Sequence, residues 1–180
     1  MIRSESTQSS LLLVMLVGCV SSVPSTPPTA GWQLSGVSLC EKYDARFISR
    51  DDRFYCLQSH VSTRYGRYWT REGPFEGDLL GQHARGWYLN DARVGGWSFE
   101  DDGGVIRAEG QYRMGRDGRW IVRYASGQVA SEVGWHRGQR SGDARWWYED
   151  GSPWWRGQYR DGRPVGAWTR WDRVGRTRPV

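Results

Sequence analysis

Glycine and aromatic positions recur along this chain with a period of 23 or 24 residues. Two series of glycines, nine residues apart, share this period: Gly95, Gly118, Gly142 and Gly166, and Gly104, Gly127, Gly151 and Gly175. An aromatic residue followed three residues later by a glycine keeps the same step, at Tyr112, Trp135 and Tyr159. Landmarks that hold a fixed period over several units are the signature of a repeat array.

Each unit reads as two short strands joined by a turn. In the unit that begins at Gly142, residues 144–148 and 154–159 carry the alternating pattern of half-buried strands. The tripeptides 149–151 and 160–162 each end in glycine, which supplies the positive φ of a hairpin turn. We therefore predict an all-β fold, an elongated antiparallel meander of β-hairpin repeats with a small N-terminal cap.

The alternation also separates two faces of the expected sheet, because neighbouring side chains of a strand point to opposite sides. One face combines large rings with small residues, so that a ring has room to lie over a glycine backbone. Its first strands contribute Trp97, Phe99, Trp120, Val122, Tyr124, Trp146 and Tyr148, and its second strands contribute Ala108, Gly110, Tyr112, Ser131, Val133, Trp135, Trp155, Gly157 and Tyr159. We expect this face to be packed.

The opposite face is mostly polar and becomes aromatic towards the C-terminus. There Trp147, Trp154 and Trp171 fall on it, beside arginines such as Arg123 and Arg156. Such a stripe is either a binding surface that stacks rings or docks a partner, or a second small core under a curled sheet. The sequence leaves both interpretations open.

The chain before the repeats begins with an export signal. Arg3 precedes an apolar run at residues 11–17, and Leu16-Val17-Gly18-Cys19 is similar to the bacterial lipobox. In a lipobox the cysteine is lipidated and becomes the mature N-terminus, so we expect residues 1–18 to be removed. The alternatives are an ordinary secretory signal and a transmembrane anchor, although seven apolar residues are far fewer than the roughly 20 that span a bilayer.

Residues 19–30 are rich in Ser, Pro and Thr, a composition that favours an extended chain, and we interpret them as a tether. Two or more acyl chains on Cys19 would hold the protein stably on a membrane. Val20 occupies the position where an aspartate would suggest retention at an inner membrane, which favours the outer membrane. The expected location is the bacterial cell envelope.

The rest of the chain divides by how regularly the glycine and aromatic positions recur. Residues 95–176 hold the clear repeats, and residues 65–94 hold degenerate ones. Residues 31–64 lack the glycine pattern, but residues 46–48 and 54–56 suggest a hairpin. We expect it to cap the first open edge of the array.

Cysteine usage fits an exported protein. With Cys19 lipidated, Cys40 and Cys56 remain as an even pair in an oxidising compartment, where a disulfide is the default. The alternative is a zinc site that also uses His60, but no fourth ligand is near in the sequence. We expect neither a metal nor a cofactor.

The chain has a formal net charge of +5, carried almost wholly by arginine, since Lys42 is the only lysine. A basic, aromatic-rich sequence is typical of nucleic-acid binding, but export argues against that partner. A solvated or stacking arginine face explains the composition. The positive charge of the chain would also attract an acidic protein surface or anionic phospholipid.

The unit from Gly142 to Gly166, together with Gly166-x-Trp168-x-x-Trp171-x-x-x-Gly175, resembles MORN repeats. The likeness is closest to the variant form found in bacterial YwqK-family antitoxin-like proteins. It covers about residues 95–175 clearly and extends weakly back to about residue 66. The resemblance implies a β-hairpin repeat sheet used for protein or lipid contact, and in some bacterial members neutralisation of a toxin. The family has no common catalytic residues.

The sequence therefore predicts a lipid-anchored, non-catalytic interaction module. The alternatives are a carbohydrate- or peptidoglycan-binding module built on the tryptophan stripe, and an antitoxin- or immunity-like protein. The chain has no Gly-x-Ser-x-Gly or His-Glu-x-x-His motif and no phosphate-binding glycine loop followed by lysine. The acidic pairs Asp51-Asp52 and Asp101-Asp102 fall at expected turns, where aspartate favours local hydrogen bonds over two-carboxylate catalysis.

We expect Cys40 and Cys56 to be bonded in protein isolated from the envelope. The bond would close a loop of about 17 residues and contribute about 3 kcal/mol of stability. Mass spectrometry of unreduced peptides should recover the cross-link, and reduction should loosen the N-terminal cap while the array past Gly95 stays folded. Two free thiols would contradict the pairing and favour the zinc alternative.

Overall fold

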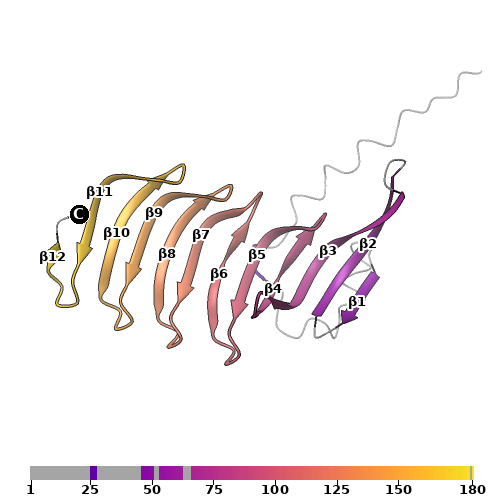
Figure 1. Cartoon of the computed structure of the whole chain (residues 1–180), viewed down its shortest axis with the longest axis horizontal. Coiled ribbons are helices and arrows are strands. Elements are labelled where there is room, and N and C mark those ends of the chain that lie inside the picture. Colours follow the sequence, from indigo (N-terminus) through magenta and orange to yellow (C-terminus); the bar gives the residue numbers. More distant parts are fainter. Residues whose placement is uncertain (1–24, 28–45, 51–52, 63–65, 179) are drawn as a thin grey trace, which may run out of the picture.

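The computed structural model describes residues 25–27, 46–50, 53–62, 66–178 and 180. Over these residues the protein is all-β, with twelve strands in one open sheet whose spatial order follows the chain order. Each neighbouring pair is antiparallel, and Figure 1 shows the strands side by side in one elongated layer. The predicted fold class, a meander of β-hairpins, is confirmed.

The strand bounds show that the sheet begins well before the clear repeats. The strands are β1 (Arg46–Arg50), β2 (Arg53–Ser62), β3 (Gly66–Leu79), β4 (Gln82–Leu89), β5 (Ala92–Glu100), β6 (Ile106–Tyr112), β7 (Arg116–Arg123), β8 (Val129–His136), β9 (Gln139–Trp147), β10 (Pro153–Arg160), β11 (Arg163–Trp171) and β12 (Thr177–Arg178). The hairpin predicted in the N-terminal cap is present as β1 and β2, and it continues the same sheet as the repeats.

Short turns at one end of the sheet use two residues that both have positive φ. At the β10–β11 turn these are Asp161 (φ 49°) and Gly162 (φ 80°), and at the β8–β9 turn Arg137 (φ 48°) and Gly138 (φ 83°). Positive φ at both positions is the mark of a type I′ turn, whose twist matches that of the flanking strands. The predicted turn at residues 160–162 is therefore present.

Longer loops at the other end repeat one hydrogen-bond pattern. In the β9–β10 loop, the Tyr148 amide donates to the Ser152 carbonyl oxygen (2.8 Å) and the Gly151 amide donates to the Tyr148 carbonyl oxygen (2.9 Å). Gly151 has φ 84°, as the sequence predicted. The same two bonds recur in the loops that begin at Asp101, Tyr124 and Asp172.

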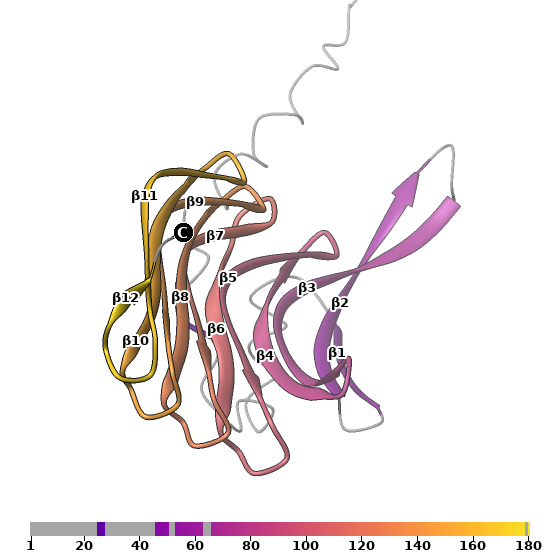
Figure 2. The same cartoon turned by 60° about the vertical axis from the view of Figure 1, so that its left-hand side comes forward.

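The strands differ from the prediction at the glycine that opens each unit. A strand was expected from residue 144, but β9 begins at Gln139 and runs through Gly142, which has φ 85°. The β8–β9 register shifts between Val133 and Trp135, so β9 bulges around Gly142 instead of beginning after it. Positive-φ glycine marks both turns and bulges, which is why the sequence pattern alone did not distinguish them. Figure 2 shows the resulting bent strands.

Tryptophan rings laid on glycine backbone form the core of the aromatic face. A Cβ built on Gly86 would lie 2.0 Å from Cδ2 of Trp97, one on Gly110 would lie 2.4 Å from Cδ2 of Trp120, and one on Gly157 would lie 2.2 Å from Cδ2 of Trp168. Each glycine belongs to the strand just before that of its tryptophan. The predicted pairing of small and large residues is therefore confirmed.

The unit that lacks this glycine also lacks the tryptophan. Val133 stands at the glycine position, and its cross-strand partner is Ala144, at the position of Trp97 and Trp120 in earlier units. Val133 is 7% exposed and Ala144 is fully buried. The Val133 and Ala144 pair replaces a glycine and tryptophan pair, so a larger residue on one strand compensates for a smaller residue on the next, as close packing requires. Val122, which the sequence placed on the packed face, is instead 40% exposed.

The polar face of β3–β5 is buried and holds a charged network that the sequence did not indicate. Nε of Arg85 donates to Oε1 of Glu76 (3.0 Å) and its guanidinium forms two bonds with Glu100. Glu76 is 4% exposed and Glu100 is 9% exposed. Burial alone would lower the pKa of Arg85, but the bonds to Glu100 and Glu76 raise the pKa above its usual value.

Part of the predicted tether packs against this buried polar face. The carbonyl oxygen of Thr26 accepts a hydrogen bond from Nε1 of Trp87 (2.8 Å). A Cβ built on Gly96 would lie 2.3 Å from the Ser25 carbonyl oxygen. Residues 25–27 therefore lie against β4 and β5, and this portion of the Ser/Pro/Thr segment is docked on the sheet.

Replacing Gly110 by Val should destabilise the protein by about 1–3 kcal/mol, because the side chain would collide with Trp120. Trp120→Ala alone should cost about 3–5 kcal/mol. The double variant copies the Val133 and Ala144 pair, so its loss should be smaller than the sum of the two single losses by at least about 1 kcal/mol. Urea unfolding of the four proteins measures this difference, and additive losses would contradict the ring-on-glycine account.

Candidate functional site

An arginine recurs two residues before the periodic glycine on β3, β5, β7 and β9. We call these residues the arginine row: Arg71, Arg93, Arg116 and Arg140. Each guanidinium lies over rings of the aromatic face. The row was not identified from the sequence, where the arginines were treated together as a solvated or stacking face.

The stacking distances are those of cation–π contacts. The guanidinium carbon of Arg71 is 4.2 Å from the Tyr88 ring centroid, and that of Arg93 is 5.1 Å from Trp97. Arg116 lies between two rings, 4.5 Å from Trp120 and 5.0 Å from Trp135. Arg140 lies 5.8 Å from Trp135 and 5.2 Å from Tyr159.

Tyrosine hydroxyls fix three of these arginines. Arg71 donates to Tyr88 (3.0 Å), Arg93 donates to Tyr112 (3.1 Å) and Arg140 donates to Tyr159 (3.1 Å). Burial alone would lower the pKa of Arg93, but hydrogen bonds with the hydroxyls of Tyr112 and Tyr88 raise the pKa above its usual value. The row is therefore a fixed set of cations on the aromatic face.

Two hollows on the aromatic face occupy equivalent places in different units. The first, which we call the arginine-lined pocket, has a volume of about 150 Å³ and is lined by Leu79, Leu80, Gln82, Arg93, Phe99, Ala108, Tyr112, Arg116 and Trp120. The second, which we call the open aromatic pocket, has about 290 Å³ and is lined by Trp146, Trp154, Trp155, Tyr159 and Trp168. Its five lining side chains are all aromatic and half-buried.

Trp168 stands at the centre of the open aromatic pocket. Its ring centroid is 5.1 Å from that of Tyr159, 6.1 Å from that of Trp146 and 6.3 Å from that of Trp155. Nε1 of Trp120, the equivalent ring in the earlier unit, donates to the Gln111 carbonyl oxygen (2.9 Å). Nε1 of Trp168 is buried and has no hydrogen-bond partner in the described part of the chain.

The predicted tryptophan stripe is not one surface. Trp154 lines the open aromatic pocket and stacks near Tyr148 at 5.6 Å. Trp147 and Trp171 are half-buried, and their carbonyl oxygens accept hydrogen bonds from the hydroxyls of Tyr124 (2.7 Å) and Tyr148 (3.0 Å). These bonds join each unit to the next. A register shift between Pro153 and Trp155 separates Trp154 from the simple alternation of its strand.

The two arginines predicted beside that stripe lie apart from the open aromatic pocket. Arg123 pairs with Glu109 at 2.5 Å on the polar face. Arg156 is exposed and lies opposite Arg145 and Thr169 in the ladder. Neither of them lines the open aromatic pocket.

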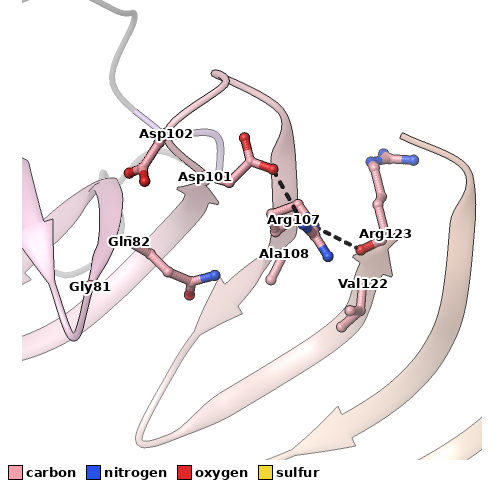
Figure 3. A pocket seen from close by; sticks show the side chains of 8 residues that line it. All are labelled: Gly81, Gln82, Asp101, Asp102, Arg107, Ala108, Val122 and Arg123. Atoms are coloured by element: carbon pink, nitrogen blue, oxygen red, sulfur yellow. Dashed lines mark hydrogen bonds and ion pairs between the residues drawn. The ribbon is translucent and has the colours of Figure 1, made fainter. Parts of the chain in front are cut away.

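A third hollow of about 420 Å³ lies beside the β5–β6 loop and contains Asp101, Asp102, Arg107 and Arg123. Figure 3 shows Arg107 between the Asp101 carboxylate (3.2 Å) and the Arg123 carbonyl oxygen (3.1 Å). Asp101 also accepts from the amides of Val105 and Gly103, and the Val105 bond is the main cause of its lowered pKa. Local hydrogen bonding of the aspartate is what the sequence predicted for this turn.

The cysteine and metal predictions fall partly outside the described residues. Cys56 is fully buried and disulfide-bonded, but Cys19 and Cys40 lie outside the described residues, so the Cys40–Cys56 pairing and the lipidation stay predictions. The side chain of His60, the third residue of the zinc alternative, is also outside them. Among the described residues, no three or more His, Cys, Asp or Glu side chains gather as a metal site.

Comparison with protein-family models finds no family that matches this chain, and comparison with curated proteins finds no match. The described part of the chain contains no helix with the length and apolar character needed to cross a membrane.

Removing the guanidinium of Arg116 should uncover Trp120 and Trp135 and cost about 0.5–1 kcal/mol, the usual strength of an exposed cation–π contact. Arg116→Ala is therefore expected to lower the urea midpoint. Arg113→Ala is the matched control, because Arg113 is exposed in the neighbouring turn. Equal effects of the two substitutions would show that ring stacking does not stabilise the array.

Proposed function

We propose that this protein is a lipid-anchored binding module of the bacterial cell envelope, non-catalytic and built from MORN-like repeats, which holds a protein partner on its aromatic face. The proposal rests on the lipobox at residues 16–19, the repeat period and the all-β array that the period forms. An immunity role, which the family resemblance implies, is one form that such binding would take.

The observation that carries the binding proposal is the open aromatic pocket. Its tryptophans and tyrosine are half-buried, so each ring keeps surface that a partner would remove from water. Protein interfaces concentrate their binding energy in such aromatic anchors within pockets. The surrounding sheet holds the rings through backbone ladders on both sides of β10, which reduces the entropy lost on binding.

The docked part of the tether supports a position close to the membrane. Ser25 is six positions after Cys19, and an extended chain spans at most about 3.6 Å per residue step, or roughly 20 Å in all. Since residues 25–27 lie against β4 and β5, a lipidated Cys19 would hold the array near the lipid surface. The open aromatic pocket is lined from β9, β10 and β11. These strands lie far along the sheet from β4 and β5 (Figure 1).

Cys19→Ser should release the protein from membranes, because the lipid is then not attached and the two-chain anchor is lost. Fractionation of cells into membrane and soluble portions measures the change. Ser21→Ala is the control, since it alters the tether and keeps the acceptor cysteine. An unchanged membrane fraction for Cys19→Ser would refute the anchoring proposal.

Partner binding is tested separately by photo-crosslinking. A crosslinking residue at position 155, in the open aromatic pocket, should capture one defined protein from the envelope, whereas one at Met114, which is 82% exposed in a turn, should not. Equal capture at both positions, or at neither, would refute binding of a protein partner at this pocket.

Carbohydrate binding is a second candidate, favoured by the five aromatic rings around one pocket, which offer flat apolar faces to a sugar ring. Pull-down on peptidoglycan and glycans tests it. If the Trp155→Ala protein is no longer retained on a glycan and the Trp147→Ala protein still is, the result would support carbohydrate binding over a protein partner.

A further inference from the structure

The open aromatic pocket and the arginine-lined pocket are built from the same positions, two units apart. Each of four side chains of the open pocket has a counterpart in the earlier one: Trp146 and Phe99, Trp155 and Ala108, Tyr159 and Tyr112, Trp168 and Trp120. The strand register supports this match, because Tyr112 pairs with Arg116 and Tyr159 pairs with Pro164 at the same place in the ladder.

The two pockets differ in side-chain size at two of these positions, where Trp146 and Trp155 replace Phe99 and Ala108, and they differ in charge at one further position. In the arginine-lined pocket, Arg116 places its guanidinium 4.5 Å from the Trp120 ring centroid. The residue at the same place in the ladder two units later is Pro164, which carries no charge and no backbone hydrogen-bond donor and does not line the open aromatic pocket. Within the described residues, no arginine stacks on Trp168, and the open pocket has about 290 Å³ where the arginine-lined pocket has about 150 Å³.

We infer that the open aromatic pocket binds the guanidinium of an arginine side chain presented by the partner protein, in the place that Arg116 fills two units earlier. This inference rests on the proposed function and names the contact through which the partner is held. Tryptophan faces are the strongest cation–π acceptors among the aromatic side chains, and this pocket contains four of them.

The hydration of the incoming cation favours guanidinium over ammonium at the open aromatic pocket. Arg140 lies over Tyr159 as Arg93 lies over Tyr112, and Arg93 and Arg116 both line the earlier pocket, so two guanidinium groups already coexist at this spacing. Arg170 is a second arginine of the chain beside the open aromatic pocket, with its guanidinium carbon 5.5 Å from the Trp155 ring centroid. A guanidinium is weakly hydrated and stacks flat on rings, whereas an ammonium is a compact, strongly hydrated charge that gains less from entering such a site.

The test is a titration of the full chain carrying Cys19→Ser, followed by tryptophan fluorescence, with small ligands in place of the partner. N-acetylarginine amide should bind, N-acetyllysine amide should bind more weakly, and N-acetylcitrulline amide, a neutral analogue of similar shape, should bind at least about tenfold more weakly than the arginine ligand.

Pro164→Arg should weaken binding of the arginine ligand by at least about tenfold, because the new side chain lies opposite Tyr159 and fills the pocket from within. Pro164→Gln removes the same proline and adds an uncharged side chain, so it should bind the ligand like the unsubstituted chain. Urea midpoints for both variants show whether the array stays folded, and the Pro164→Arg protein is expected to be the more stable of the two.

Equal binding of the arginine and citrulline ligands, or equal loss in both Pro164 variants, would overturn the inference. Binding of a neutral sugar without binding of the arginine ligand would also overturn it, in favour of the carbohydrate candidate. The titration involves neither a membrane nor a partner protein, so its failure is distinguishable from failure of the anchoring or crosslinking experiments.

Discussion

The contact on which this structure depends is a tryptophan ring lying on the backbone of a glycine in the preceding strand. A single-layer sheet offers little volume for a core, so burial must come from wide, flat side chains close to the backbone. Glycine is required beneath the ring, since a Cβ at Gly157 would lie 2.2 Å from Cδ2 of Trp168. The same pair recurs at Gly86 with Trp97 and at Gly110 with Trp120, and it joins neighbouring hairpins wherever Val133 and Ala144 do not replace it.

The arginine row follows from this core. Rings that lie flat on one face of a thin sheet keep their outer faces near water, and a guanidinium covers such a face without losing its hydration entirely. Arg93 and Arg116 do this for Trp97 and Trp120. Where Pro164 interrupts the row, the last aromatic cluster stays open. The proposed recognition site therefore uses positions that stabilise the sheet in earlier units.

The two ends of the array are stabilised in different ways. The central parts of β3–β5 are buried on both faces, because the Glu76, Arg85 and Glu100 network and residues 25–27 lie on their polar side. Towards β11 the polar face is exposed and held by surface pairs, such as Gln158 with Asp143 at 3.0 Å. Buried, paired charges resist disruption more than surface pairs do. The polar face is thus covered in β3–β5 and more accessible in the C-terminal strands that carry the open aromatic pocket.

The sequence by itself determined the hairpin period, the turn at Gly151, the packed face with Trp97 and Trp120, and the small residue beneath each ring, because these depend on backbone conformation and on strand alternation. Only the tertiary structure decided that β9 runs through Gly142 as a bulge, that Trp154 joins the pocket of Trp146, and that residues 25–27 dock on the sheet. Bulges shift the cross-strand register by contacts between units, and docking depends on segments far apart in the chain. Neither is encoded in the local period of side chains.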